Sequence, residues 1–352
     1  MQAALNMARR GLGRVWPNPA VGCVLVKNGV VIGRGRTADG GRPHAETQAL
    51  AQAGFEARGA MAYVSFEPCC HEGKTPPCTK ALIAAGVKRV IVGCTDPDAR
   101  VSGKGIAELR KAGIEVETDV LSAEAQDLNK GFILRVTEKR PLVTLKTATS
   151  KDGKIAPEKG KQKWITGKLS RAKVHLERSL HDAVLVGIGT VLADDPSLTT
   201  RLPDYDHRIV RIVLDTHLRI PLDSQLVKTA KGYPLWVFHS SGNNDKIEKL
   251  GKAGVRLFAY DTSDIPGVLG QLAEEGITRL LVEGGAKVHT SFLLMGLCDR
   301  FLWFRAPENL GPGAVDALEG YNIFKIGPEF GLARQNALVL GEDLLEIYTR
   351  SA

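Results

Sequence analysis

One histidine, one glutamate and two cysteines lie in a single stretch of the sequence, at His44, Glu46, Cys69 and Cys78. One imidazole and two thiolates give a zinc ion three ligands and balance its charge, and they leave the fourth tetrahedral position open for water. Glu46 follows His44 closely enough to share its pocket and carry protons. These residue types predict a hydrolytic site with one Zn²⁺ per chain, held by His44, Cys69 and Cys78, and with Glu46 as the catalytic residue.

The elements around these residues should bring them together. Pro43 breaks the chain just before an apolar-periodic run, which places His44 in the first turn of a helix. Cys78 follows two prolines and opens a second helical run, where the helix dipole favours its thiolate. Cys69 comes directly after the strand predicted for 61–66. We therefore expect both helix starts to face one edge of a sheet.

A closed structural zinc site is the alternative to a catalytic one. The pattern is close to the deaminase signature H-x-E followed by P-C-x-x-C. Here, however, eight residues separate Cys69 from Cys78, and the insert offers Cys70 and His71 as a fourth ligand. The closed site leaves the adjacent Glu46 without a role, and the catalytic interpretation is preferred for that reason.

Several motifs are more specific together than any one alone. They are Asn18-Pro19-Ala20-Val21-Gly22, His44-Ala45-Glu46, the long loop from Glu67-Pro68-Cys69 to Cys78, Trp164-Ile165-Thr166, Val191 to Pro196, and Glu283-Gly284-Gly285. With them the chain resembles, over essentially its whole length, the bifunctional riboflavin-biosynthesis deaminase/reductase family, which keeps the eight-residue insert. The resemblance implies an α/β protein with an N-terminal cytidine-deaminase-like three-layer domain and a C-terminal dihydrofolate-reductase-like domain.

Length and composition agree with a two-domain globular protein. At 352 residues the chain exceeds the size that one core usually supports. The charged, proline-punctuated stretch at 137–141 marks the boundary, which gives a deaminase domain over 1–139 and a reductase domain over 140–352. No run of 18 apolar residues and no signal-type N-terminus occurs, so we expect a cytoplasmic protein without a membrane partner.

Net charge and cysteine content exclude fewer functions than the motifs do. The net charge of +8 suits anionic partners, but it does not choose between nucleic acid and phosphorylated small molecules. Six cysteines are too sparse for a disulfide scaffold. Cys23, Cys94 and Cys298 lie in apolar runs and are expected to be buried free thiols.

The order of predicted elements supports the fold. Two β-rich runs joined by Asn28-Gly29 predict a hairpin, and strands then alternate with helices, which indicates a sheet covered on both faces. The loop around Asp96-Pro97-Asp98 follows an apolar strand, so it is either part of a ligand crevice or a capped turn. In the second half the alternation continues, and 189–200 is expected to be a loop.

The second half lacks the G-x-G-x-x-G motif of a standard dinucleotide fold. Glu283-Gly284-Gly285 follows an apolar strand and opens a helix, so it is either a diphosphate site or a plain tight turn. The resemblance implies that NADPH contacts Ala148, Trp164, Thr190, Asp194, Thr216, Gly285, Ala286, Lys287, Val288, His289, Thr290 and Ser291. It implies substrate contacts at Asn18, Gln162, Arg178, Leu198, Arg201 and Glu283. The segment from Asp194 to Pro196 could instead be a capping turn.

The resemblance also implies the reactions. The enzyme would deaminate 2,5-diamino-6-ribosylamino-4(3H)-pyrimidinone 5′-phosphate with zinc and then reduce the ribosyl group to ribityl with NADPH. The implied partners are this phosphorylated pyrimidine and a second copy of the chain, bound through the reductase domain. A nucleic-acid deaminase with an accessory domain is the main alternative, but aromatic residues make up only 6% of the chain and no basic stripe carries interleaved stacking residues. A zinc-stabilised binding protein is a second alternative, which an assay for ammonia release would separate.

Overall fold

The computed structural model describes residues 1–73, 76–156 and 165–350. Two of the expected contact residues, Gln162 and Trp164, lie outside these ranges. The chain divides into two compact units. The first comprises Met1–Pro141 together with Ala273–Thr278, and the second comprises Leu142–Leu272 together with the residues from Arg279 onward.

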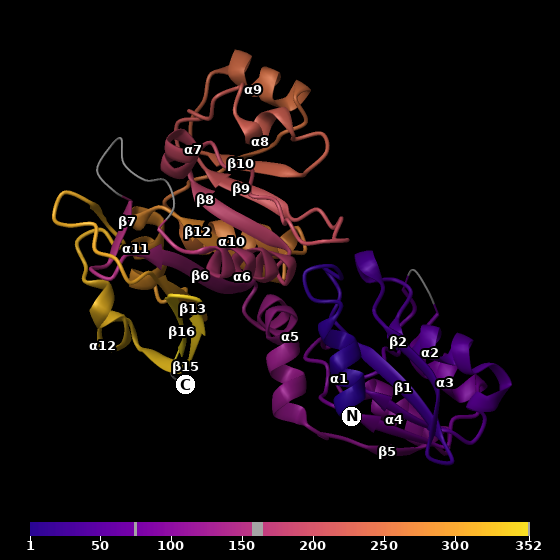
Figure 1. Ribbon diagram of the computed structural model, residues 1–352. Helices are drawn as coiled ribbons and strands as arrows, with labels where there is room; N and C mark the ends of the chain where they lie inside the picture. The colour runs from indigo at the N-terminus through magenta and orange to yellow at the C-terminus, as the bar shows by residue number, and fades with distance from the viewer. Residues whose placement is uncertain (74–75, 157–164, 351–352) are drawn as a thin grey trace. The chain divides into compact units, whose positions relative to one another are not determined.

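The first unit is built on one five-stranded sheet in the order β2-β1-β3-β4-β5 (Figure 1). Its strands are β1 (Gly22–Lys27), β2 (Val30–Arg36), β3 (Met61–Val64), β4 (Arg89–Val92) and β5 (Glu115–Glu117). Its helices are α1 (Gln2–Arg9), α2 (Ala45–Ala53), α3 (Cys78–Ala84), α4 (Lys104–Lys111) and α5 (Ser122–Thr137). β1 pairs antiparallel with β2 and β3, while β3, β4 and β5 run parallel.

The predicted hairpin is confirmed. Asn28 and Gly29 both have positive φ, at 50° and 77°, and Lys27 pairs with Val30 across the turn. A two-residue turn of this kind matches the twist of the flanking strands and is favoured by Asn-Gly.

Helices cover both faces of this sheet, as the three-layer prediction requires. One face packs against residues of α1 and α5, including Leu5 and Leu128. The other packs against α2, α3 and α4, including Ala49, Leu82 and Leu109. The helices that carry His44 and Cys78 therefore lie on the same face.

The second unit contains a nine-stranded sheet in the order β11-β10-β9-β8-β12-β6-β13-β16-β15. Its strands are β6 (Leu142–Thr149), β8 (Ala183–Gly187), β9 (Val210–Leu214), β10 (Leu235–His239), β11 (Arg256–Ala259), β12 (Arg279–Gly284), β13 (Arg300–Arg305), β15 (Leu332–Leu340) and β16 (Asp343–Arg350). The strands from β11 to β13 are parallel, and β16 and β15 add antiparallel at one edge. A short pair joins β7 (Lys154–Ala156) to β14 (Val315–Asp316).

The helices of this second part of the chain are α6 (Lys168–Ser179), α7 (Ile188–Asp194), α8 (Gln225–Lys228), α9 (Asn244–Lys252), α10 (Ile265–Glu274), α11 (Ala286–Leu294) and α12 (Ile326–Phe330). Within the described ranges, no helix is long and apolar enough to cross a membrane. Cys23, Cys94 and Cys298 are free and buried, as predicted.

The prediction of a loop over 189–200 is wrong for the first part of this range, because α7 occupies Ile188–Asp194. Gly189 and Thr190 have low helix propensity, which hid the helix. Ile188 and Val191 pack into the core of the second unit, and this tertiary burial decides the conformation.

Candidate active sites

The three predicted zinc donors meet on one side of the first unit. His44 is the N-cap residue of α2, with extended backbone (φ −72°, ψ 160°), and Cys78 is the first residue of α3. Cys69 lies a few residues beyond the end of β3. Their donor atoms all lie within 4.8 Å of one another.

The spacing of the donors fits zinc. The His44 Nδ1 atom is 3.3 Å from Cys78 Sγ and 3.6 Å from Cys69 Sγ. Ligands at tetrahedral zinc bond distances are separated by about 3.6 Å. One imidazole and two sulfurs are therefore already arranged as a three-ligand zinc set, without a fourth protein donor in the group.

The local charges also fit a cation. A hydrogen bond from Cys78 and the contact with His44 lower the pKa of Cys69 to about 4. The same pairing with Cys69, together with burial, raises the pKa of Cys78. A divalent cation at this position would favour the thiolate form of both cysteines.

Glu46 lies in the first turn of α2 and is only 3% exposed. Burial, followed by the charge of Cys69, raises its pKa to about 7. A carboxyl group with such a pKa can both accept and return a proton near neutral pH.

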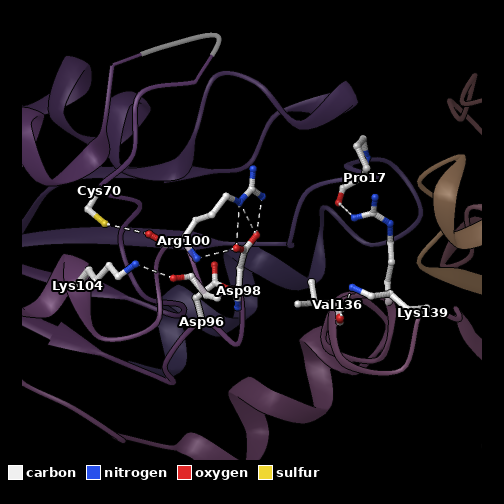
Figure 2. Close-up of polar contacts among 10 residues, drawn as sticks. Pro17, Cys70, Asp96, Asp98, Arg100, Lys104, Val136 and Lys139 are labelled. Carbon is white, nitrogen blue, oxygen red and sulfur yellow. Dashed lines mark hydrogen bonds and ion pairs between the residues drawn. The ribbon is translucent and has the colours of Figure 1, made fainter.

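Cys70, one of the two rival ligands of the insert, is turned elsewhere. The Cys70 thiol points to the backbone carbonyl of Arg100, 3.8 Å away (Figure 2). Neither Cys70 nor His71 belongs to the donor cluster found among the described residues. The geometry is that of an open site, in which one face of the metal would stay free for water and substrate.

Asn18 is held next to the segment that leads into the zinc site. Its side-chain amide donates a hydrogen bond of 2.8 Å to the Gly41 carbonyl, three residues before His44. Glycine is needed at position 41 because a Cβ atom there would lie 2.2 Å from Asn18 Nδ2. Its backbone is also left-handed, with φ +88°. This side chain is therefore fixed close to the predicted deaminase pocket.

In the second unit, the expected contact residues follow the carboxyl ends of adjacent parallel strands. Thr216 follows β9, Thr190 lies in α7 after β8, Gly285 follows β12, and Ala148 lies near the end of β6. These strands are neighbours in the order β9-β8-β12-β6. Ligands bind outside the carboxyl ends of strands in open α/β sheets, so this edge is the candidate cofactor site.

The start of α11 presents backbone N–H groups directly after a glycine turn. Gly285 has φ +87°, a conformation that favours glycine, and it directly precedes the helix. A Cβ atom on Gly284 would lie 2.7 Å from Thr190 Oγ1, so α7 and α11 begin close together. Backbone N–H groups at a helix start are an anion-binding arrangement.

The side chains later in α11 are engaged within the protein. His289 contacts the Thr147 hydroxyl (3.0 Å) and the Val282 carbonyl (3.3 Å). Thr290 donates to the Ala286 carbonyl and accepts from the Glu319 N–H. Of the expected cofactor residues in this helix, those near its start offer backbone groups, whereas these two side chains hold the helix in place.

The segment from Asp194 to Pro196 could be either a cofactor contact or a capping turn, and Asp195 is the residue that forms a cap. Asp195 has φ +40°, ends α7, and accepts a hydrogen bond of 2.8 Å from the Gln225 N–H at the start of α8. Asp194 is exposed in the last turn of α7. Its side chain is therefore accessible to solvent.

Arg178 and Glu283 form a buried ion pair. The distance between Arg178 Nη2 and Glu283 Oε2 is 2.9 Å, and the two side chains are 13% and 6% exposed. Although burial opposes it, the guanidinium lowers the pKa of Glu283. Arg178 also donates to the Thr199 carbonyl, which brings the segment of Leu198 next to this pair.

Arg201 approaches from the same segment. Its N–H donates to His175 Nδ1 (3.3 Å) on α6, and its guanidinium donates to the Ser197 hydroxyl (2.6 Å). Burial, followed by the charges of Arg178 and Arg201, lowers the pKa of His175. The four residues of the second unit that are described and expected to contact substrate, Arg178, Leu198, Arg201 and Glu283, therefore lie around one charged cluster.

Sequence reasoning missed Lys146 as a member of this cluster. Burial lowers its pKa, and Glu283 is the nearby charge that opposes this shift. The available signal was a lysine inside a strand whose other residues are apolar or hydroxyl-bearing, since a lysine is rarely buried without a partner.

Comparison with known proteins extends over both units. Residues 141–343 match the family described as RibD C-terminal domain, and residues 1–94 match the cytidine and deoxycytidylate deaminase zinc-binding region. The riboflavin biosynthesis protein RibD of Aquifex aeolicus is 42% identical over 350 residues, which cover 99% of this chain and 97% of that protein.

Two solved structures have the same fold throughout. Acinetobacter baumannii RibD (form 1) is 36% identical, with a TM-score of 0.91 over 100% of this chain and 98% of that chain. A diaminohydroxyphosphoribosylaminopyrimidine deaminase/5-amino-6-(5-phosphoribosylamino)uracil reductase from Thermotoga maritima is 37% identical, with a TM-score of 0.88 over 100% and 97% of the two chains.

Proposed function

This chain belongs to the RibD family of bifunctional riboflavin-biosynthesis deaminase/reductases, and we propose the residues that carry each of its two reactions. The protein is an enzyme that uses Zn²⁺ and NADPH. Its substrate in this proposal is 2,5-diamino-6-ribosylamino-4(3H)-pyrimidinone 5′-phosphate. The observation that carries the proposal is the three-donor cluster of His44, Cys69 and Cys78 with the buried Glu46 beside it.

In the first reaction the 2-amino group of the pyrimidine is exchanged for oxygen from water. Zinc held by His44, Cys69 and Cys78 supplies Lewis-acid activation of the attacking water. Glu46 accepts a proton as the new C–O bond forms and returns it to the amine as the C–N bond breaks, so that ammonia leaves. Glu46 is buried beside the three donors, which places its carboxyl group within the zinc pocket for both transfers.

In the second reaction the ribosyl group is reduced to ribityl. NADPH supplies the hydride to the sugar carbon that bears nitrogen. Arg178 and Arg201 bind the anionic substrate, and Glu283 orients Arg178 through their ion pair. As the bond between that carbon and the ring oxygen breaks, Lys146, whose pKa is lowered by burial, donates the proton that the ring oxygen takes up.

A nucleic-acid deaminase is not favoured, because more than half of the chain matches the RibD C-terminal domain. We further propose that the enzyme works in the cytoplasm as a homodimer assembled through the second unit. The strand β15 supports such a contact because it lies at the edge of the sheet, and an unpaired strand edge readily pairs with another chain. The side chain of Val339, in this strand, is 77% exposed. Light scattering that reports a monomer at working concentration would contradict the dimer.

Zinc content and ammonia release test the ligand assignment together. Cys69→Ser and Cys78→Ser should each lose zinc and deaminase activity, because either change leaves two strong protein ligands. The matched variant Cys70→Ser changes a neighbouring thiol that points away from the cluster, so it should keep one zinc per chain and its activity. Loss of zinc in Cys70→Ser would put Cys70 into the ligand set.

A further inference from the structure

We propose that Glu67 is a positioning residue for the deaminase reaction: its carboxylate holds both ends of the 96–103 loop and thereby fixes this loop beside the zinc-site insert. The proposal rests on the deaminase function proposed above. Glu67 lies two residues before Cys69 and is only 4% exposed. It carries none of the roles assigned so far.

The backbone of Glu67 is fixed by an extension of the sheet. The pairing of β3 with β4 continues beyond both strands, because the Gly93 N–H donates to the Val64 carbonyl (2.9 Å) and the Glu67 N–H donates to the Cys94 carbonyl (2.9 Å). The side chain therefore starts from a rigid position, at the carboxyl end of the central strands.

Four backbone N–H groups converge on this one carboxylate. Its Oε2 atom accepts from Asp96 (3.2 Å) and Gly103 (3.0 Å), which are the two ends of the loop. Its Oε1 atom accepts from Gly105 (3.1 Å) and Ile106 (3.3 Å) in the first turn of α4. N–H groups in a first helical turn lack partners within the helix, and a carboxylate there is also favoured by the helix dipole. One side chain thus closes the loop and seats the helix that follows it.

The loop between these ends is compact and reaches the zinc-site insert (Figure 2). Asp98 forms an ion pair with Arg100, and the Lys104 ammonium donates to the Ala99 carbonyl (2.7 Å). The Cys70 thiol contacts the Arg100 carbonyl, 3.8 Å away. The loop therefore adjoins the part of the insert that lies next to Cys69.

The helix after the loop has little freedom to move with it. A Cβ atom on Gly105 would lie 2.2 Å from the Pro68 carbonyl oxygen, so α4 begins in direct contact with the residue before Cys69. Glu108 accepts a hydrogen bond of 2.8 Å from the Thr79 hydroxyl, next to Cys78. Because α4 is held at these points, loss of the Glu67 contacts should release mainly the loop.

The variant Glu67→Gln tests this role with little change in shape. A glutamine side chain has one accepting oxygen and one NH₂ group, and the NH₂ group would face two N–H donors. If the correctly placed loop is populated only about one tenth of the time, the apparent affinity for the pyrimidine falls by the same factor. We expect KM for deamination to rise about 10-fold, kcat to stay within about threefold, and zinc content and reductase activity to stay unchanged.

Two further variants test the same role even if Glu67→Gln does not fold stably. Gly103 has φ +77°, a backbone conformation that alanine disfavours, and its added Cβ atom would meet open space. Gly103→Ala should therefore strain the end of the loop and raise KM while Glu67 stays unchanged. Gly113→Ala introduces the same strain at φ +83°, also in open space, after the far end of α4. As the matched control, it should leave KM unchanged. Hydrogen exchange of the amides of Gly103 and Ile106 should speed up in Glu67→Gln but not in Gly113→Ala.

The outcomes separate this inference from the proposed function. Unchanged KM in both Glu67→Gln and Gly103→Ala, in an active zinc enzyme, would overturn the positioning role alone. A KM rise in Gly113→Ala as large as that in Gly103→Ala would also overturn it, since the effect would then follow from general destabilisation. Loss of zinc in Glu67→Gln together with unchanged KM in Gly103→Ala would make Glu67 a structural residue. Absence of ammonia release from the wild-type enzyme would instead reject the proposed function.

Discussion

Two histidines of the second unit, His181 and His289, are buried and neutral. Burial lowers the pKa of each to about 4, from an ordinary value of 6.5. The neutral ring of His181 is matched to its neighbours, since Nδ1 lies 2.7 Å from the Glu177 carbonyl and Nε2 lies 2.9 Å from the Thr144 hydroxyl. Protonation would place a charge in this interior.

The histidines therefore predict a loss of stability in mild acid. The unfolded chain takes up these protons below pH 6.5, while the folded chain takes them up only near pH 4, so stability falls as pH drops through this window. The effect of His181 is roughly 3 kcal/mol at its largest. Denaturant unfolding at pH 7, 5.5 and 4.5 measures it. His181→Gln should flatten part of the slope, and an identical slope in that variant would contradict the assignment.

Single residues differ in how far the sequence reveals their role. The clustering of His44, Cys69 and Cys78 could be predicted, because their spacing combines a metal-ligand set with helix starts and a strand end. The contacts of Glu67 could not be predicted, because its four partners come from a loop and a helix later in the chain. A glutamate before a proline carries no local signal of burial.

At the scale of elements, the turn from β12 into α11 is the feature on which cofactor binding depends. Gly285→Val places a β-branched residue at φ +87°, where such a side chain is strongly disfavoured, so the turn should shift and NADPH affinity should fall. A shift that costs about 1.4 kcal/mol or more lowers affinity about 10-fold or more. Titration of NADPH fluorescence on the purified enzyme measures this affinity.

The matched control for this turn is Gly251→Ala in α9, where a Cβ atom meets open space at ordinary helical geometry. That variant should bind NADPH as the wild type does. Zinc content should be the same in both variants. Unchanged NADPH affinity in Gly285→Val would move the cofactor away from the start of α11.

Elements with a strong local pattern were predicted well, and those that depend on tertiary packing were not. The Asn28-Gly29 hairpin follows from turn chemistry alone. The helix α7 was missed because its glycine and threonine oppose helix formation, while burial of Ile188 and Val191 stabilises it. The C-terminal strand β15 was also missed, since most of it is exposed and its sequence shows no clear alternation.

At the scale of the whole molecule, each unit has its own cluster of chemically active residues. Glu46 and the zinc donors belong to the first unit, while Lys146, Arg178 and Glu283 belong to the second. Length and the charged stretch before Leu142 predict two units. They do not predict that Ala273–Thr278, from the middle of the second half, groups with the first unit.

The central claim is that two independent active sites occupy one chain, and Glu46→Gln tests it most directly. The change keeps the size of the side chain and the zinc ligands but removes the group that accepts and returns the proton. Positioned acid/base groups contribute about 100- to 10,000-fold, and one carboxylate serves both transfers here, so ammonia release should fall toward the upper end of that range. The measurement is ammonia release and NADPH oxidation on the same preparation, with the already deaminated ribosylaminouracil phosphate as substrate for the second. We predict near-complete loss of deamination with full NADPH oxidation and one zinc per chain. Retained deamination, or loss of both activities in a folded, zinc-containing protein, would contradict the account.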